Sequence, residues 1–189
     1  SLIGDVLDLS VIEARGEAMR DEALDLEQLG EDCVRMISDQ AAAAGIEIIS
    51  DINLKNHALK ADARRIRQII INLLTNAVKF TPQGGRTELS AKLQEDGCVR
   101  LVVSDTGSGM DAATKAHAFE PFMQGSSSMV RKAEGAGLGL ALVKRLTELH
   151  QAELECISAP GEGTTISILF PARRSVAAPP YQSILEVGH

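Results

Sequence analysis

The pattern of apolar and polar positions predicts a chain that mixes helices with strands. Apolar residues recur at helical spacing over residues 62–80 and again over 138–149. A third helix is expected from Asp25, a residue suited to a helix N-cap, to Ala44, because Gly45 can end it. Alternating or β-branched runs predict strands over residues 46–52, 86–93, 99–104, 153–158 and 164–170.

Other parts of the chain carry weaker patterns. Residues 1–18 have apolar residues at seam spacing and predict a helix, and residues 19–26 are expected to form a linker and a short strand. Residues 111–134 are polar and irregular, which suits a mobile lid. Residues 172–189 contain a proline pair and are expected to form a loosely held tail.

Composition limits the classes of function. The length of 189 residues fits one domain plus an appendage, and the net charge of −7 argues against a nucleic acid partner, which needs a basic face. Cys33, Cys98 and Cys156 are too widely spaced to indicate a zinc site or a disulfide framework, so a reducing cytosol is expected. No apolar run approaches the roughly 20 residues of a membrane helix. We expect a cytoplasmic domain, and a parent protein anchored in the inner membrane is compatible with it.

The segment QIIINLLTNAVKFTP, residues 68–82, carries unusual chemistry for a helix with a buried face. Asn72, Asn76 and Lys79 are spaced i, i+4 and i+7, which places two amides and an ammonium along one face. Amide oxygens suit Mg²⁺ and a lysine suits phosphate. An amphipathic helix whose Asn and Lys merely face water has the same spacing, so this segment alone decides nothing.

Two glycine-rich segments follow the helix. An apolar run ends in Asp105, with Gly107 and Gly109 after it, which predicts a carboxylate at the rim of a sheet. Residues 135–140 read GAGLGL and lead into a helix, whose free N–H groups and positive end suit phosphate.

The order of these segments resembles the catalytic, ATP-binding domain of sensor histidine kinases. Residues 72–81 match the N box of that family, 105–109 its first glycine box, 119–122 its F box and 135–140 its second glycine box. The resemblance implies an α/β fold of the Bergerat type, in which a mixed, mostly antiparallel sheet is covered on one face by three helices. It further implies that residues 1–18 are the second helix of the dimerisation hairpin, 19–171 the catalytic domain and 172–189 the tail.

The resemblance also assigns ATP and Mg²⁺ as ligands and gives residues roles at the phosphates. Asn76 is expected to ligate Mg²⁺, Asn72 to support the metal or its waters, and Lys79 to meet phosphate oxygens; these three are the expected catalytic residues. Glycine N–H groups are expected to wrap the phosphates, and two lid cations to reach the γ-phosphate; these residues are Gly135, Gly137, Gly139, Arg131 and Lys132.

At the base, Asp105 is expected to accept a hydrogen bond from the exocyclic amine of adenine. Thr164 or Thr165 is expected to close the base pocket, and the sequence does not choose between them. The remaining residues expected at the nucleotide are Phe80, Gly107, Gly109 and Met110, with Leu138 and Leu140 in the core or the pocket wall.

The family transfers the γ-phosphate to a histidine on the first helix of the hairpin, for relay to the receiver domain of a response regulator. None of His57, His117, His150 and His189 has the sequence setting of that acceptor, so we expect it upstream, in a parent that dimerises through the hairpin. A non-catalytic nucleotide-binding module is the alternative. A dedicated ATPase is disfavoured, because Asn72 stands where those enzymes have a glutamate as general base.

Overall fold

The computed structural model describes residues 19–121 and 137–178. Its elements, in chain order, are β1 (Glu22–Leu24), α2 (Leu26–Ala44), β2 (Glu47–Asn53), β3 (His57–Ala61), α3 (Ala63–Phe80), β4 (Arg86–Leu93), β5 (Val99–Asp105), α4 (Ala112–His117), α5 (Gly139–Leu149), β6 (Glu153–Ser158), β7 (Thr164–Phe170), the 3₁₀ helix η2 (Ala172–Arg174) and β8 (Ser175–Ala177). The predicted helices and strands are confirmed within one or two residues at each end. The hairpin helix expected over 1–18, and most of the expected lid, lie outside the described residues.

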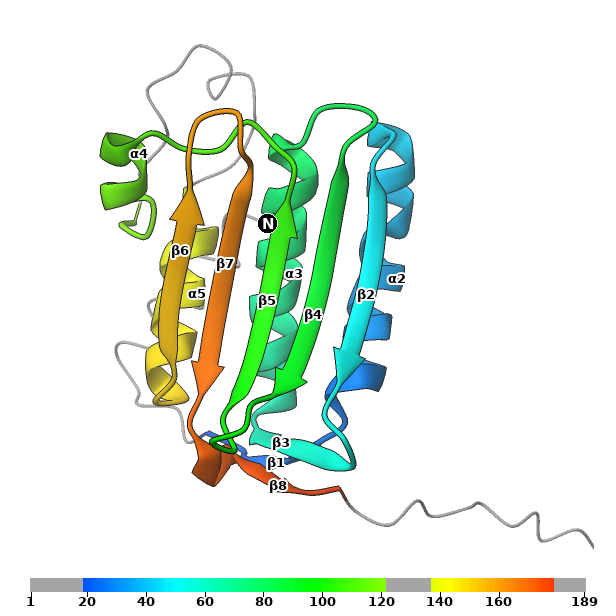
Figure 1. The fold of residues 1–189 in the computed structure, drawn as a ribbon, viewed down its shortest axis with the longest axis vertical. Helices are drawn as coiled ribbons and strands as arrows, with labels where there is room; N and C mark the ends of the chain where they lie inside the picture. Colours follow the sequence, from blue (N-terminus) through cyan, green and yellow to red (C-terminus); the bar gives the residue numbers. More distant parts are fainter. Residues whose placement is uncertain (1–18, 122–136, 179–189) are drawn as a thin grey trace, which may run out of the picture.

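The main sheet has five strands in the order β2-β4-β5-β7-β6. Strands β2 and β4 run parallel, and the other neighbours are antiparallel. Helices α2, α3 and α5 cover one face of this sheet, as Figure 1 shows. The expected mixed, mostly antiparallel sheet with three helices on one face is therefore confirmed.

Helix α3 owes its position to a cap and an apolar face. The Asp62 side chain accepts a hydrogen bond from the N–H of Arg65 and so satisfies one of the free donors at the start of the helix. Apart from Arg65, the buried residues of the helix are aliphatic, and they are Ile66, Ile69, Ile70, Leu73, Leu74, Ala77 and Val78. Because these residues fix the helix against the sheet, the polar stripe on its other side has a defined position.

The end of the chain corrects one expectation. The tail predicted over 172–189 is not loosely held up to residue 178, because β8 pairs with β3, which also pairs with β1 in a small three-stranded sheet. Arg174 is buried, and its Nη1 donates to Asp21 Oδ2 at 3.0 Å and to the C=O of Lys60 at 2.7 Å. These partners lie far from Arg174 in the chain, so no local sequence pattern predicts these hydrogen bonds.

The segment after the first glycine box also differs from expectation. Residues 111–134 were expected to be irregular, but Asp111 caps the short helix α4, accepting a hydrogen bond from the N–H of Thr114 at 2.7 Å. Phe119 of the F box is partly buried against the core. Only the first part of the expected lid can be compared, and that part is helical.

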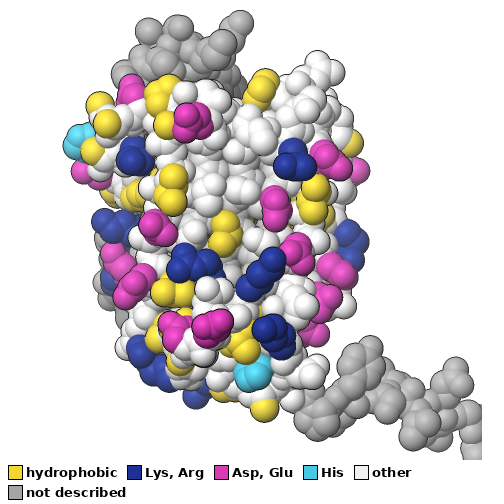
Figure 2. All heavy atoms as spheres, viewed as in Figure 1, with side chains coloured by type: hydrophobic (Ala, Val, Ile, Leu, Met, Phe, Trp, Pro, Cys, Tyr) yellow, Lys and Arg dark blue, Asp and Glu magenta, His cyan; other side chains and the backbone are white. Residues whose placement is uncertain are grey.

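The face of the sheet that carries no helices is polar. Figure 2 shows Lys and Arg side chains interleaved with Asp and Glu over this face, with a few hydrophobic side chains among them. Two ion pairs join strands of this sheet, Lys92–Asp51 at 3.1 Å and Arg100–Glu155 at 3.8 Å. Among the described residues, no helix is both long and apolar enough to cross a membrane.

A buried polar cluster joins the linker to the start of α3. Asp62 accepts a hydrogen bond from the N–H of Arg20 at 3.1 Å, and its own N–H donates to His150 Nε2 at 3.4 Å. His150 Nδ1 lies 2.8 Å from the C=O of Leu146, which can only accept, so the proton is on Nδ1. His150 is fully buried and is the C-cap residue of α5. Gln151, which follows it, takes a left-handed φ of +55°.

We expect the protein to lose stability as the pH falls below about 6.5, the ordinary pKa of histidine. Burial lowers the pKa of His150, so the unfolded chain takes up this proton more readily than the folded protein. The stabilisation is complete above the ordinary pKa and is lost as the pH falls toward the folded value, by at most about 1.4 kcal/mol per pH unit. Urea unfolding between pH 7.5 and 5.5 measures this loss.

The control is a pair of matched variants. His150→Gln should remove most of the pH dependence, whereas His57→Gln, at an exposed histidine, should retain it. An unchanged slope in His150→Gln would show that another group is responsible.

Candidate functional site

The Asn and Lys stripe of α3 lies against the start of α5. The Nδ2 of Asn72 donates to the C=O of Gln68 at 2.9 Å, which fixes the amide. A Cβ placed on Gly139 would lie 3.1 Å from Asn72 Oδ1 and 3.7 Å from Asn76 Nδ2. The backbone of α5 therefore approaches both amides at a point where no side chain intervenes.

The first turn of α5 is suited to an anion. Its N-cap residue, Leu138, provides no side-chain hydrogen bond to the helix, and Gly137 before it has a left-handed φ of +68°. Leu138 is buried in the interior, so only its backbone can meet a ligand, and Leu140 packs against the core. An uncapped helix start presents free N–H groups and a partial positive charge.

Lys79 lies one turn beyond Asn76. Its Nζ is 5.1 Å from the centre of the Phe80 ring, and partial burial lowers its pKa. Phe80 is 36% exposed, which is unusual for a large apolar side chain in this protein. The end of α3 thus carries a cation and an aromatic ring at the surface.

Asp105 ends β5 on the face of the sheet that the helices cover. Its Oδ1 accepts two backbone hydrogen bonds, from Gly107 at 2.8 Å and from Thr164 at 3.2 Å. Burial raises the pKa of this carboxyl, and the two N–H donors oppose that rise. Since both donors use Oδ1, and Oδ2 has no partner among the described residues, Oδ2 is left to accept a hydrogen bond from a ligand.

Two turns meet in close backbone contact around this carboxylate. A Cβ on Gly107 would lie 2.6 Å from the C=O oxygen of Phe80, and one on Gly109 would lie 1.9 Å from that of Ala159. The N–H of Gly161 donates to the C=O of Ser108 at 2.7 Å. The first glycine box is therefore seated between the end of α3 and the turn that joins β6 to β7.

Ser158, which the sequence analysis did not identify, ties these turns together. Its hydroxyl accepts from the N–H of Met110 at 2.8 Å and donates to the C=O of Gly163 at 2.9 Å. The Ser158 proton is thereby used, so the Thr164 hydroxyl, 3.0 Å away, donates to Ser158 and keeps its lone pairs as acceptors. The S-A-P-G sequence before the turn was the available signal.

The strand register separates the two threonines. Thr164 stands opposite Asp105, and Thr165 stands opposite Ser104, whose side chain points to the other face. Of the two, Thr164 therefore lies with Asp105.

The chain matches a known protein family. Residues 61–174 match the family model described as histidine kinase-, DNA gyrase B- and HSP90-like ATPase. The chain belongs to this family. The match includes the α3 stripe, both glycine segments and the β6–β7 turn.

The relatives place this ATPase domain among sensor histidine kinases, as their catalytic ATP-binding domain. The chain is 37% identical over 193 residues to the circadian input-output histidine kinase CikA of Synechococcus elongatus, covering 100% of this chain and 26% of that protein. It is 40% identical over 179 residues to the non-motile and phage-resistance protein of Caulobacter vibrioides, covering 93% of this chain and 21% of that protein. The chain thus spans about a quarter of the length of these relatives.

A solved structure shares the fold of this ATPase domain. It is the full-length ShkA crystal structure in complex with AMPPNP, with a TM-score of 0.82 and 33% sequence identity. The likeness covers 95% of this chain and 36% of that one.

The structure brings most predicted site residues of this ATPase domain into two groups. One group, at the α3–α5 junction, contains Asn72, Asn76, Gly137 and Gly139; the other, at the end of the sheet, contains Phe80, Asp105, Gly107, Gly109, Met110 and Thr164. Lys79 lies between them along α3. Arg131, Lys132 and Gly135 lie outside the described residues.

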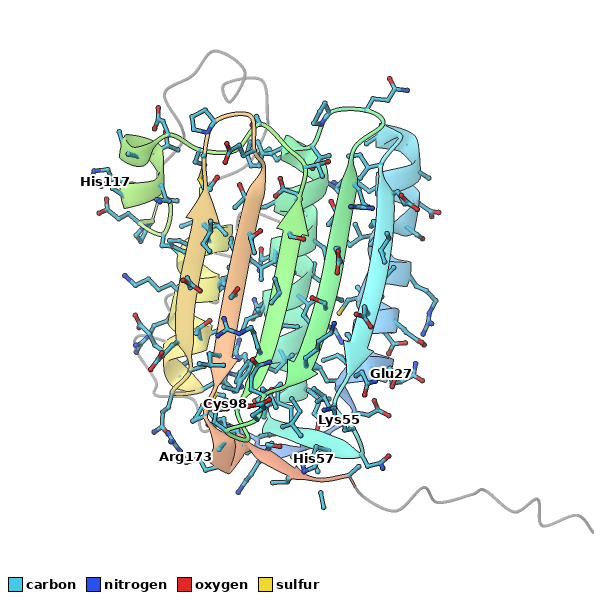
Figure 3. All side chains as sticks on the ribbon, viewed as in Figure 1. Glu27, Lys55, His57, Cys98, His117 and Arg173 are labelled. Atoms are coloured by element: carbon cyan, nitrogen blue, oxygen red, sulfur yellow. The ribbon has the colours of Figure 1, made fainter. Side chains whose placement is uncertain are left out.

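The histidines of the described segments lie away from the α3 stripe. His150 is the buried C-cap residue of α5, and His57 lies at the end of the molecule that carries the small sheet (Figure 3), with its Nδ1 3.1 Å from the C=O oxygen of Lys55. His117 lies on α4, with its Nδ1 3.1 Å from Glu120 Oε1.

The donor set around the stripe fits a hard cation. Asn76 supplies an amide oxygen, the kind of ligand that Mg²⁺ takes alongside phosphate oxygens. The described residues contain no cluster of three or more His, Cys, Asp or Glu side chains that could hold a metal alone. Phosphate oxygens would have to complete the coordination of a cation here.

Proposed function

We propose that the domain binds ATP with Mg²⁺ and transfers the γ-phosphate to a histidine on a dimerisation hairpin upstream of it. The phosphoryl group then passes to the receiver domain of a response regulator, and the parent protein is a homodimer. The observation that carries this proposal is the approach of Asn72 and Asn76 to the backbone of Gly139. Amide ligands and the N–H groups of a helix start meet there, as polyphosphate binding needs.

Each residue of the candidate site has a role that follows from its position. Asn76 binds the cation and Asn72 orients its water shell, while Lys79 and the first turn of α5 hold the phosphate oxygens. When bound, Mg²⁺ neutralises the charge of the phosphates. Asp105 Oδ2 accepts from the exocyclic amine of adenine, and Phe80 lies beside the nucleotide. The chain thus contributes positioning and charge, which phosphoryl transfer chiefly requires.

The same geometry predicts slow hydrolysis. Asn72 cannot accept a proton from water at neutral pH, so the α3 stripe supplies no general base. Phosphoryl transfer therefore depends on a histidine delivered to the site rather than on activation of water.

A phosphotransfer assay in trans tests the proposal. The protein, mixed with a hairpin that carries the acceptor histidine, should produce an acid-labile phosphoprotein when ATP and Mg²⁺ are present. Asn76→Ala should slow this transfer roughly 10- to 100-fold, because it removes a metal ligand. The matched control is Asn53→Ala on the exposed edge strand β2.

Three results would contradict the proposal. They are transfer that is equally fast in Asn76→Ala, transfer that persists in EDTA, and ATP hydrolysis without acceptor at about 1 s⁻¹ or faster, a rate typical of dedicated enzymes.

A further inference from the structure

Thr87 on β4 carries a buried hydroxyl that has no hydrogen-bond partner in the described part of the chain. Its side chain is 0% exposed, and no described residue makes a hydrogen bond with its Oγ1. Most buried hydroxyls in proteins are paired, since desolvating an unpaired one is unfavourable. A polar atom from outside the described residues, such as that of a water molecule, is therefore expected beside Thr87.

Register places Thr87 next to the candidate base site. Thr87 stands opposite Asp105, Asp105 opposite Thr164, and Thr164 opposite Ser158, so the four side chains form one row across four strands. We call these four residues the polar row. It crosses the end of the sheet where the β6–β7 turn lies, at the top of Figure 1.

Thr87 and Asp105 face each other as a non-hydrogen-bonded pair of the antiparallel ladder, the kind in which side chains are closer together. The next ladder bond, from the N–H of Thr106 to the C=O of Arg86 at 3.0 Å, makes Arg86 and Thr106 the hydrogen-bonded pair. Thr87 and Asp105 are then a non-hydrogen-bonded pair, in which facing side chains approach more closely.

Two other buried atoms lack partners in the described part of the chain, and their positions differ. These are Arg174 Nε, in the 3₁₀ helix η2, and Ser175 Oγ, in β8 of the small sheet, both at the opposite end of the molecule (Figure 1). Of these three residues, only Thr87 lies next to a residue of the candidate base site.

The hydrogen-bonding capacity of Thr87 and Asp105 indicates which group can lie between them. The threonine hydroxyl does not bond the carboxylate directly, yet it can donate, and Asp105 Oδ2 can accept. A water molecule that accepts from Thr87 and donates to Oδ2 satisfies both groups, and buried waters bridge polar groups in this manner.

We propose that Thr87 is a base-selectivity residue, whose hydroxyl holds a water shared with Asp105 and so keeps Oδ2 directed at the exocyclic amine of adenine. This inference rests on the proposed function. Thr87 does not touch the base itself and acts as a positioning residue through the carboxylate. Guanine presents an oxygen where adenine has its amine, so an Oδ2 that is well held favours adenine over guanine.

Calorimetric titration of the full chain with ATP and with GTP tests this role. Thr87→Val keeps the side-chain volume and removes the hydroxyl; it should weaken ATP binding about 5- to 10-fold and leave GTP binding nearly unchanged. Thr87→Ser restores a hydroxyl and should recover most of the ATP preference. Melting temperatures should show that both variants remain folded.

Each possible result supports or contradicts this inference. Wild-type protein that binds neither nucleotide overturns the proposed function, and this inference with it. Wild-type protein that prefers ATP, together with a Thr87→Val variant of equal preference, overturns this inference alone. A Thr87→Ser variant that loses the ATP preference as Thr87→Val does would show that a hydroxyl at this position is not sufficient, and would also reject the inference. A high-resolution structure with no water between Thr87 and Asp105 would remove the proposed bridge.

Discussion

Asp105→Asn should reduce ATP affinity by roughly 3–4 kcal/mol, or about 10²- to 10³-fold. Asp105 Oδ1 accepts both backbone donors, from Gly107 and from Thr164. An asparagine has one carboxamide oxygen, which these donors will retain, so its NH₂ group takes the place of Oδ2. The asparagine NH₂ group and the adenine amine, both donors, then face each other. A buried charge-assisted hydrogen bond between the carboxylate and the amine is lost.

Titration with both ATP and GTP makes this prediction specific. The NH₂ group of asparagine can donate to the oxygen of guanine, so the ratio of ATP to GTP affinity should fall at least as far as ATP affinity does. Asp111→Asn is the matched control, because it changes the same charge at the exposed cap of α4, where asparagine also caps well. Unchanged ATP affinity in Asp105→Asn would refute the assignment of the base site.

Gly163→Ala should destabilise the protein by about 4 kcal/mol or more. Gly163 has a φ of +76°, and a Cβ there would lie 1.9 Å from the C=O oxygen of Asp105. The obstacle is backbone, so no side-chain rotation can relieve it, and β5 would have to move from β7. Nucleotide binding should fail with the fold, since the same movement displaces the N–H of Thr164 from Asp105.

Gly161→Ala provides the control within the same turn. Gly161 has a similar φ of +79°, but a Cβ there would meet nothing within 4 Å. Its cost should be limited to the left-handed conformation, about 1 kcal/mol. Urea unfolding of the two variants separates close contact from backbone conformation, and equal losses would contradict the contact argument.

The sequence was sufficient where the decisive interactions are local. Asp25 and Asp62 cap helices through residues three positions ahead, and the alternation over β4 to β7 follows from burial of one face. It failed where short elements depend on distant partners. Strand β8 exists because it pairs with β3, and Arg174 reaches Asp21 across 153 positions.

The candidate site likewise contains some residues that the sequence could predict and others that it could not. The Asn, Asp and Gly residues of the candidate site stand in recognisable motifs, so their positions could be predicted. Ser158 and Thr87 are ordinary residues of strands, and only the register across β6, β7, β5 and β4 brings them beside Asp105. The register was also needed to show that Thr164, and not Thr165, stands opposite Asp105.

The small sheet also decides how the domain can be joined to other chain segments. Arg20 is held at the start of α3, and Ala178 donates its N–H to the C=O of Asn56, so both ends of the described fold leave from one pole (Figure 1). The polar row lies at the other pole. A foreign domain joined directly to Arg20 or to Ala178 would therefore attach at the pole opposite the polar row. The unit is thus suited to transfer between longer polypeptides as a cassette.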